Sequence, residues 1–205
     1  MITEIDPALG VPTLSPSCAN FLDGRGLDGF GLSLGTMSYY VVIRGPLGVG
    51  KSAVSRKLAQ RIGAVYISID QILDDQGLWE SGRLSEFLRA NDFVISRARA
   101  SLDRGVPVVI DGNFYWKSQI RDLVGRLRGH HYVVTLKAPL KVCIARDGGR
   151  EPSHGRKAAR QVYAKSTRFE YGIGLDATGP IEPVVRQLIA MVSAIPAKPT
   201  PRIAP

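Results

Sequence analysis

One octapeptide, GPLGVGKS at residues 45–52, constrains the fold of this chain more than any other feature. It matches the pattern G-x-x-x-x-G-K-[ST] in full, and it follows the β-rich run Tyr39–Arg44 at the opening of a helical pattern. Glycines at the first, fourth and sixth positions let backbone N–H groups surround a phosphate without a Cβ in the way. We therefore predict a strand, a phosphate-binding loop and a helix in this order.

This loop predicts a binding site for a nucleoside triphosphate. The N–H groups of the loop and of the first helical turn, together with the positive end of the helix dipole, suit a polyanion. Lys51 would contact the β- and γ-phosphates as a mobile charge, and the Ser52 hydroxyl suits Mg²⁺, which prefers hard oxygen ligands. A glycine-rich turn that binds no ligand is the alternative. The residues expected to contact the nucleotide are Gly45, Gly48, Val49, Gly50, Lys51, Ser52 and Ala53.

Beyond the loop, short β-rich runs alternate with helical periods, which is typical of βαβ units around a parallel sheet. The pattern therefore predicts an α/β fold of three layers with five parallel strands, and glycines at 63 and 105 are expected to end two of the helices. The predicted strands are Tyr39–Arg44, Val65–Ile69, Val106–Ile110, Tyr132–Leu136 and, more weakly, Ile173–Leu175. The predicted helices are Lys51–Ile62, Asp92–Arg104, Ser118–Leu127, Pro139–Arg146, Arg156–Phe169 and Pro180–Ile195.

The two ends of the chain lack these patterns. Residues 1–38 hold six glycines and three prolines and are expected to form a flexible leader, with Met37 as an alternative start of the protein. Residues 196–205 are rich in proline and are expected to be a disordered tail. One domain over residues 39–195 is the resulting prediction.

Cysteine content and hydropathy favour a cytoplasmic protein. The only two cysteines, Cys18 and Cys143, are too few for a disulfide framework or a structural zinc site. No run approaches the roughly 18 consecutive apolar residues of a membrane span. Glu4 and Asp6 stand where a signal peptide would be basic. We expect no membrane partner.

Two predicted strands end in a carboxylate, and ligands of open α/β sheets bind beyond the carboxyl ends of the strands. Asp111 follows four apolar residues and fits a carboxylate that holds Mg²⁺; an Asp-Gly turn is the alternative. Asp70 is a candidate general base for the proton of an attacking hydroxyl. The alternative for Asp70 is an N-cap of the helical stretch that begins at Gln71.

The net charge of +9 is concentrated in one stretch, because nine basic and two acidic residues lie within residues 137–168. In this stretch, Arg146 and Arg150 flank two glycines. The arrangement suits a mobile lid that closes over a transferring phosphate, stabilises its charge and excludes water. Solvated cations at a helix end are the alternative.

From Tyr39 to about Ile195, the chain resembles the P-loop kinases of the nucleotide-kinase-like group. This group includes nucleoside monophosphate, shikimate, gluconate and polynucleotide 5′-hydroxyl kinases, zeta toxins and chloramphenicol phosphotransferases. The segments that carry the resemblance are GPLGVGKS, ISID ending at Asp70, VVIDGN with Asp111 and Asn113, LKAPLKVCIARDGGR with Arg146 and Arg150, and GLDATGPIEPVV.

The resemblance implies a P-loop NTPase fold with strand order 2-3-1-4-5 and a short basic lid that holds the arginine pair. It further implies ATP as the phosphate donor, Asp70 acting on the acceptor hydroxyl, and residues 175–179 bordering the adenine. Two departures concern the acceptor. Leu73 stands where polynucleotide kinases typically have an arginine, and no Pro-Arg follows Asp111-Gly112 as it does in nucleoside monophosphate kinases.

We therefore predict an ATP- and Mg²⁺-dependent kinase that transfers the γ-phosphate to a hydroxyl of a small molecule. A polynucleotide 5′-hydroxyl kinase, favoured by the basic stretch, and a nucleotide-gated regulatory NTPase are the alternatives. The predicted catalytic residues are Lys51, Asp70, Arg146 and Arg150, and the predicted metal ligands are Ser52 and Asp111. The aromatic candidates for an acceptor pocket, with core packing as their alternative, are Trp79, Phe87, Phe114, Tyr115 and Trp116.

Overall fold

The computed structural model describes residues 38–78 and 82–194, and the predicted tail and nearly all of the predicted leader lie outside these residues. Within them, five strands form one sheet in the order β2-β3-β1-β4-β5, and every strand pair is parallel. This confirms the predicted α/β fold and strand order. The strands are β1 (Tyr39–Arg44), β2 (Val65–Ser68), β3 (Val108–Gly112), β4 (His130–Lys137) and β5 (Ile173–Asp176).

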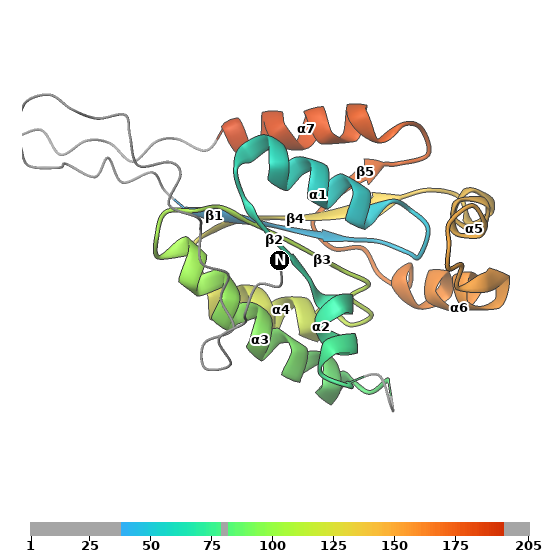
Figure 1. The fold of residues 1–205 in the computed structure, drawn as a ribbon, viewed down its shortest axis with the longest axis horizontal. Coiled ribbons are helices and arrows are strands. Elements are labelled where there is room, and N and C mark those ends of the chain that lie inside the picture. The colour runs from blue at the N-terminus through green and yellow to red at the C-terminus, as the bar shows by residue number, and fades with distance from the viewer. Residues whose placement is uncertain (1–37, 79–81, 195–205) are drawn as a thin grey trace, which may run out of the picture. The chain divides into compact units, whose positions relative to one another are not determined.

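Helices cover both faces of the sheet (Figure 1). Helices α1 and α7 lie on one face and α2, α3 and α4 on the other, whereas α5 and α6 pack together beyond the carboxyl ends of the strands. Among the described residues, every helix is too short or too polar to span a lipid bilayer. The helices are α1 (Lys51–Ile62), α2 (Ile69–Asp75), α3 (Leu84–Leu102), α4 (Lys117–Leu127), α5 (Leu140–Gly148), α6 (Gly155–Ser166) and α7 (Ile181–Ser193).

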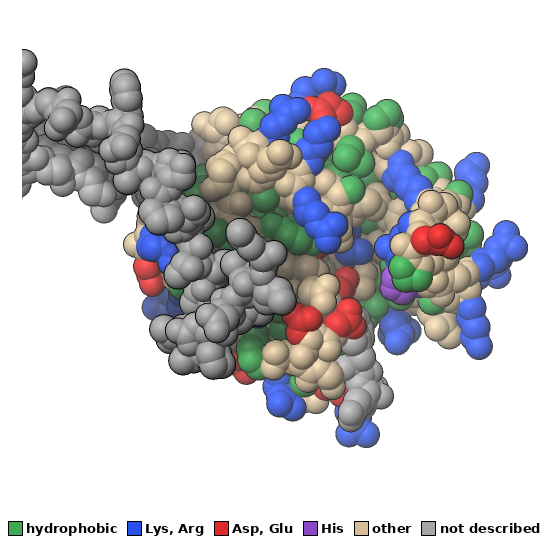
Figure 2. Space-filling model, viewed as in Figure 1, with side chains coloured by type: hydrophobic (Ala, Val, Ile, Leu, Met, Phe, Trp, Pro, Cys, Tyr) green, Lys and Arg blue, Asp and Glu red, His purple; other side chains and the backbone are tan. Residues whose placement is uncertain are grey.

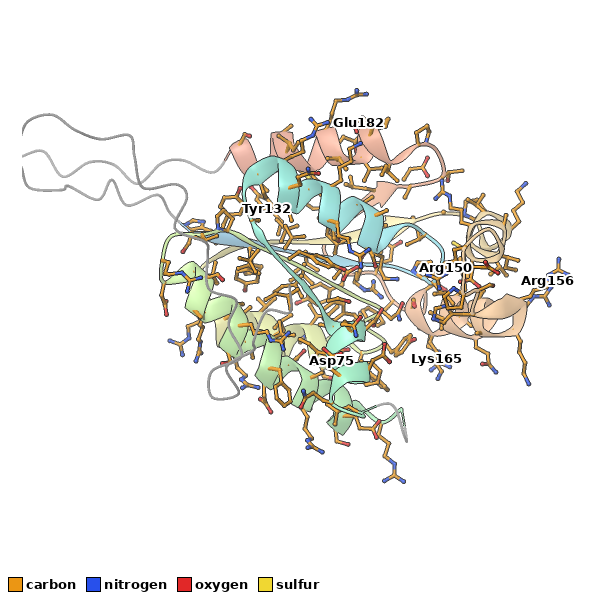
Figure 3. The ribbon with its side chains drawn as sticks, in the orientation of Figure 1. Asp75, Tyr132, Arg150, Arg156, Lys165 and Glu182 are labelled. Carbon is orange, nitrogen blue, oxygen red and sulfur yellow. The ribbon has the colours of Figure 1, made fainter. Side chains whose placement is uncertain are left out.

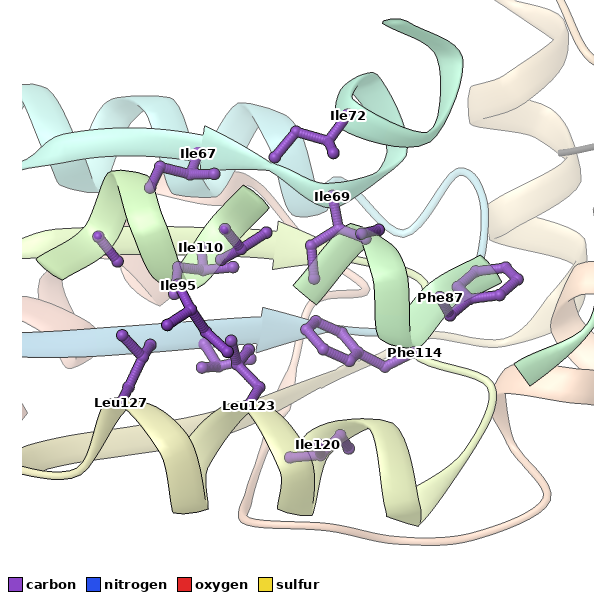
Figure 4. Packing of buried hydrophobic residues seen from close by; sticks show 14 of the residues in the cluster. Ile67, Ile69, Ile72, Phe87, Ile95, Ile110, Phe114, Ile120, Leu123 and Leu127 are labelled. Carbon is purple, nitrogen blue, oxygen red and sulfur yellow. The ribbon is translucent and has the colours of Figure 1, made fainter. Parts of the chain in front are cut away.

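Each face of the sheet has its own hydrophobic core. Under α3 and α4, buried side chains such as Ile110 of β3, Ile95 of α3 and Leu123 of α4 pack together (Figure 4). Burial of one such side chain contributes roughly 1.5–3 kcal/mol. The central strand β1 is buried from Tyr40 to Arg44, so both cores hold it in place. The loop that follows β1 therefore starts from a rigid position.

Helix α3 begins at Leu84 rather than at the predicted Asp92. The Glu86 carboxylate accepts a hydrogen bond from the backbone N–H of Arg83 at 3.0 Å, which satisfies one of the donors that a helix start leaves unpaired. Buried Phe87 then lies on the face of α3 that packs on the sheet. The prediction missed these first two turns.

Strand β3 extends to Gly112 rather than ending at Ile110. Asp111 therefore lies within the strand, where Ile43 of β1 and Ser68 of β2 are its partners in the two neighbouring strands. The interpretation of Asp111 as part of an Asp-Gly turn is wrong. Its side chain lies at the carboxyl edge of the sheet, next to the phosphate-binding loop.

Candidate active site

The phosphate-binding loop connects the buried end of β1 to the start of α1. Gly45, Gly48 and Gly50 have φ values of 153°, 79° and 102°. These angles lie in the left-handed half of backbone space, which L side chains rarely adopt, so the loop requires glycine at these positions. The turn leads directly into Lys51, the first residue of α1.

Gly48 is the loop position least able to accept a side chain. An added Cβ would lie 2.1 Å from the backbone oxygen of Cys143 in α5. We expect Gly48→Ala to displace the loop and to weaken Mg·ATP binding about 10- to 100-fold, because a displaced N–H loses a hydrogen bond to a charged phosphate, which contributes about 1.5–3 kcal/mol. Titration calorimetry measures the affinity. Gly125→Ala in α4, where a Cβ meets nothing within 4 Å, is the control that should bind normally. Normal binding by Gly48→Ala would contradict this account.

Lys51 is buried at the base of the loop. Its Nζ donates to the backbone oxygen of Pro46 at 3.1 Å and to Oδ1 of Asn113 at 3.0 Å. Burial lowers the pKa of Lys51, and the charges of Asp70 and Asp111 oppose this effect. Asn113 in turn donates its Nδ2 to Oδ2 of Asp70 at 3.0 Å. One amide thus bridges Lys51 and the candidate base.

Asp70 lies in the first turn of α2, where its half-buried carboxylate lines a cavity. Burial raises the pKa of Asp70 to about 6, although the charge of Lys51 and the backbone N–H of Asn113 lower it. The N-cap of α2 is Ser68, whose Oγ accepts the backbone N–H of Gln71 at 3.3 Å. The interpretation of Asp70 as the N-cap is therefore wrong.

The Asp111 carboxylate is buried and accepts hydrogen bonds from two hydroxyl groups. Ser52 Oγ donates to Oδ2 at 2.8 Å, and the Tyr66 hydroxyl donates to Oδ1 at 3.0 Å. Hard oxygen atoms of a serine and a carboxylate lie together beside the phosphate loop, which fits Mg²⁺. Among the residues that the structure describes, no group of three or more His, Cys, Asp or Glu could hold a metal ion alone. A magnesium ion here would therefore need phosphate oxygens or water as further ligands.

Lys51, Ser52, Asp70 and Asn113 line one cavity of about 860 Å³, whereas the buried Asp111 is not among the described residues of its wall. Its wall includes several residues singled out from the sequence: Gly48, Gly50, Lys51, Ser52, Ala53, Asp70, Arg146 and Arg150. It also includes polar residues for which the sequence analysis assigned no role: Arg56, Tyr66, Ser68, Gln71, Asp74, Arg97, Asn113 and His154. Asn113 ends the segment VVIDGN, shortly after a predicted strand, and this position could have indicated that it lies at the site. Tyr66 and Arg97 carry no such signal.

The aromatic candidates divide between cavity and core. Tyr115 lines the cavity, whereas Phe87 and Phe114 are buried in the core below the sheet, as the core alternative holds. Trp116 packs edge-on against Phe87 and Tyr115, with ring centroids 5.0 and 5.8 Å apart. Trp79 lies outside the described residues.

Arg146 lines the cavity, and its guanidinium donates to four backbone oxygens. These belong to Val49 (3.2 Å), Ala177 (2.7 Å), Thr178 (2.8 Å) and Gly179 (2.7 Å). Arg146 thus ties the phosphate loop to the segment after β5, which the resemblance places at the adenine. Its action on the transferring phosphate stays a prediction. The contacts favour a different role, in which Arg146 holds the phosphate loop and the segment after β5 in position.

Arg150 also lines the cavity and has a different set of partners. Its guanidinium forms an ion pair with buried Asp147 at 2.7 Å and contacts His154. Ser153 and the backbone N–H groups of His154 and Gly155 donate to the same carboxylate. Arg150 lies on the side of the α5–α6 pair that faces the sheet (Figure 3), so its charge is held near the phosphate loop.

Arg44 at the end of β1 is a buried cation that the sequence analysis did not single out. It donates to Thr135 Oγ1 at 3.1 Å and to the backbone oxygens of Ser166 (2.6 Å) and Phe114 (3.4 Å), and it stacks on Phe169 at 4.3 Å. Burial lowers the pKa of Arg44 to about 10. The residue before the phosphate loop is thereby fastened to the end of α6.

Basic side chains gather around α5 and α6 (Figure 2). Within the described part of the chain, no ion pair involves the following six exposed residues of this surface: Lys141, Arg156, Lys157, Arg160, Lys165 and Arg168. Arg156 points away from the sheet (Figure 3). This surface adjoins the cavity, because Ala158 and Val162 of α6 line the cavity wall.

The loop, the strand order and the two strand-end carboxylates define a P-loop domain of the nucleotide-kinase-like group. The sequence comparison agrees with this class. Residues 41–170 match the family described as an AAA domain, and the chain belongs to this family. No curated protein matches the chain.

Solved structures with the same fold include several kinases. An unliganded sugar kinase from Janibacter sp. HTCC2649 is 20% identical with a TM-score of 0.65, over 78% of this chain and 97% of that one. An APS kinase from Mycobacterium tuberculosis in complex with AMPPNP and APS is 15% identical with a TM-score of 0.64, over 77% and 99%. A gluconokinase from Sinorhizobium meliloti 1021 is 21% identical with a TM-score of 0.55, over 77% and 93%. At these identities the likeness concerns the fold.

Proposed function

We propose that this chain is an ATP- and Mg²⁺-dependent kinase that transfers the γ-phosphate to a hydroxyl group of a small molecule. The main support for the proposal is a pair of hydrogen bonds through Asn113. They connect the ammonium group of Lys51, proposed to bind phosphate, to the carboxylate of Asp70 in one cavity. A small acceptor is supported by the structural neighbours, which include a sugar kinase, a gluconokinase and an APS kinase.

In this mechanism, the N–H groups of the loop and Lys51 hold the β- and γ-phosphates of the donor. Asp70 accepts the proton of the acceptor hydroxyl while the acceptor oxygen forms its bond to the γ-phosphorus. The bond from the γ-phosphorus to the bridging oxygen breaks, and ADP leaves with that electron pair. Magnesium at Ser52 and Asp111 would supply neutralising charge for the phosphates. We also propose that Gly45, Val49 and Ala53 contact the nucleotide, as predicted from the sequence.

Arg150 would supply further positive charge as negative charge spreads over the transferring group. In the structure Arg150 forms an ion pair with the Asp147 carboxylate. To contact the phosphate, Arg150 would have to leave this carboxylate and pair with the phosphate instead. The two glycines between Asp147 and Arg150 let the backbone turn at this point. Closure would also exclude water from the cavity.

The pH dependence of the reaction should report the state of Asp70. A base acts in its deprotonated form, and the pKa of Asp70 is raised to about 6. We therefore expect kcat/KM to rise with pH through about 6 and to level off above it. A pH–rate profile at saturating Mg·ATP checks this. A profile that stays flat from pH 5 to 8 would contradict Asp70 as the base.

A screen of hydroxyl-bearing metabolites for ATP consumption tests the proposed function, with Lys51→Ala as the control protein. We expect one class of acceptor to raise consumption above hydrolysis by water, with a phosphate ester as product. Nucleotide binding without stimulation by any acceptor, together with a partner bound only in the ATP state, would favour the regulatory NTPase instead.

The six exposed cations of the α5–α6 surface favour a nucleic acid 5′-hydroxyl as the second candidate acceptor. Binding of single-stranded RNA or DNA should then fall steeply with salt concentration. The absence of binding at low salt would exclude this candidate.

A further inference from the structure

Tyr66 reaches the candidate metal carboxylate from the edge of the sheet. It lies on β2, the edge strand of the sheet within the described residues, and its backbone partner in β3 is Val109. Asp111 is two residues further along β3 and is paired with Ser68. Residues two apart on a strand share a face, so the long tyrosine side chain can span this distance. Its hydroxyl donates to Asp111 Oδ1 at 3.0 Å.

The two carboxylate oxygens of Asp111 accept hydrogen bonds from different residues. Oδ2 accepts from Ser52, the residue expected to bind the metal ion, and Oδ1 accepts from Tyr66. Among the described residues, no cation forms an ion pair with this carboxylate. When Ser52 turns its oxygen toward a metal ion, the Tyr66 hydroxyl is the side-chain donor that continues to orient the carboxylate.

The tyrosine ring is itself held in place. It is half-buried at the cavity wall, and the guanidinium of Arg56 on α1 lies 5.4 Å from its ring centroid. Such cation–π contacts contribute about 0.5–1 kcal/mol at exposed sites. The ring therefore presents its hydroxyl to Asp111 from a defined direction.

We propose that Tyr66 is a positioning residue for the magnesium ion, and that its hydroxyl holds Asp111 with Oδ2 directed at the metal site beside Ser52. Partners of this kind orient metal ligands, and their loss typically lowers metal affinity by about 10- to 100-fold. The inference rests on the proposed function only in requiring that the loop bind a magnesium nucleotide. Tyr66 would thus take part in nucleotide binding, in addition to the phosphate loop and the carboxylates of Asp70 and Asp111.

The test is the gain in AMPPNP affinity that Mg²⁺ confers, measured by titration calorimetry with Mg²⁺ and with EDTA. For Tyr66→Phe, which keeps the ring, we expect unchanged affinity in EDTA and a magnesium-dependent gain about tenfold smaller than in the wild type. Asp111→Asn should remove most of this gain. The matched control is Tyr163→Phe, because the half-buried Tyr163 on α6 also donates its hydroxyl, to the backbone oxygen of Ala138 at 3.3 Å. Thermal unfolding shows whether each variant is folded.

The outcomes separate this inference from the proposed function. A full magnesium-dependent gain in Tyr66→Phe, or an equal loss in Tyr66→Phe and Tyr163→Phe, overturns the positioning role. If the wild type binds no AMPPNP, both proposals fail. If the gain falls in Tyr66→Phe but not in Tyr163→Phe, and no acceptor is ever phosphorylated, the positioning role stands and the kinase proposal fails, because this measurement needs no acceptor.

Discussion

Asp70→Asn is expected to lower kcat by about 10²- to 10⁴-fold, the range that a positioned general base contributes. Asparagine has nearly the same size as aspartate, but its amide does not take up the acceptor proton at neutral pH. The affinity for Mg·ATP should change little, because the loop and Lys51 carry that interaction. Steady-state kinetics together with calorimetry separate the two effects.

The stability of Asp70→Asn gives a second readout. The pKa of Asp70 is raised from its ordinary value of 3.8 to about 6, so the fold disfavours the ionised form. The group therefore destabilises the folded protein as pH rises through about 6, and this effect is fully present at pH 7.5. We expect the melting temperature of Asp70→Asn at pH 7.5 to be equal to or higher than that of the wild type.

The matched control for Asp70→Asn is Asp75→Asn. Asp75 is exposed on the same helix, accepts from Gln71 Nε2 at 2.8 Å and is absent from the cavity wall (Figure 3). Its replacement should leave kcat unchanged. Equal losses of turnover and of ATP affinity in Asp70→Asn would rule against the assignment of Asp70 as the base.

Lys51→Ala is expected to lower kcat/KM for ATP by about 10³-fold or more. A hydrogen bond to a charged group contributes about 1.5–3 kcal/mol, and loss of a positioned donor to developing charge costs about 10²–10³ in kcat. Removal of the ammonium also leaves Asn113 Oδ1 without its donor. The measurement is ATP affinity by calorimetry and turnover with the acceptor from the screen.

Lys57→Ala serves as the control for Lys51→Ala. Lys57 is also on α1, but it forms an ion pair with Glu182 of α7 at 2.6 Å. A partly exposed pair of this kind contributes about 0–1 kcal/mol, so turnover should be retained. Retained affinity and turnover in Lys51→Ala would remove the phosphate-binding role of this lysine.

Predictions of secondary structure succeeded where the signal is local. Helix α1 begins and ends as predicted, because the loop glycines precede it and Gly63, with φ of 63°, ends it. All five strands occur, since apolar β-branched runs bounded by turns are themselves local signals. The start of α3 was missed, although Phe87 continues its apolar face, and Gly105 with φ of 76° lies in the turn after α3 rather than at its cap.

The prediction of the site was less complete than that of the fold. Lys51, Ser52 and Asp70 were expected at one ligand site, and all three line the same cavity. Their catalytic and metal-binding roles stay predictions. The bridge through Asn113 and the contact from Tyr66 could not be read from the chain, because each joins residues that lie 43 or more positions apart in sequence.

Glycine geometry and hydrophobic period act over a few residues, so the phosphate loop and the alternation of strands and helices could be predicted from the chain alone. Which groups face one another in the cavity follows from the packing of the folded domain. The register of β3 against β1 and β2 directs Asp111 to Ser52 and Tyr66, and the packing of α5 near the phosphate loop directs Arg146 to backbone oxygens. These partners depend on distances between distant segments, which packing of the whole domain establishes.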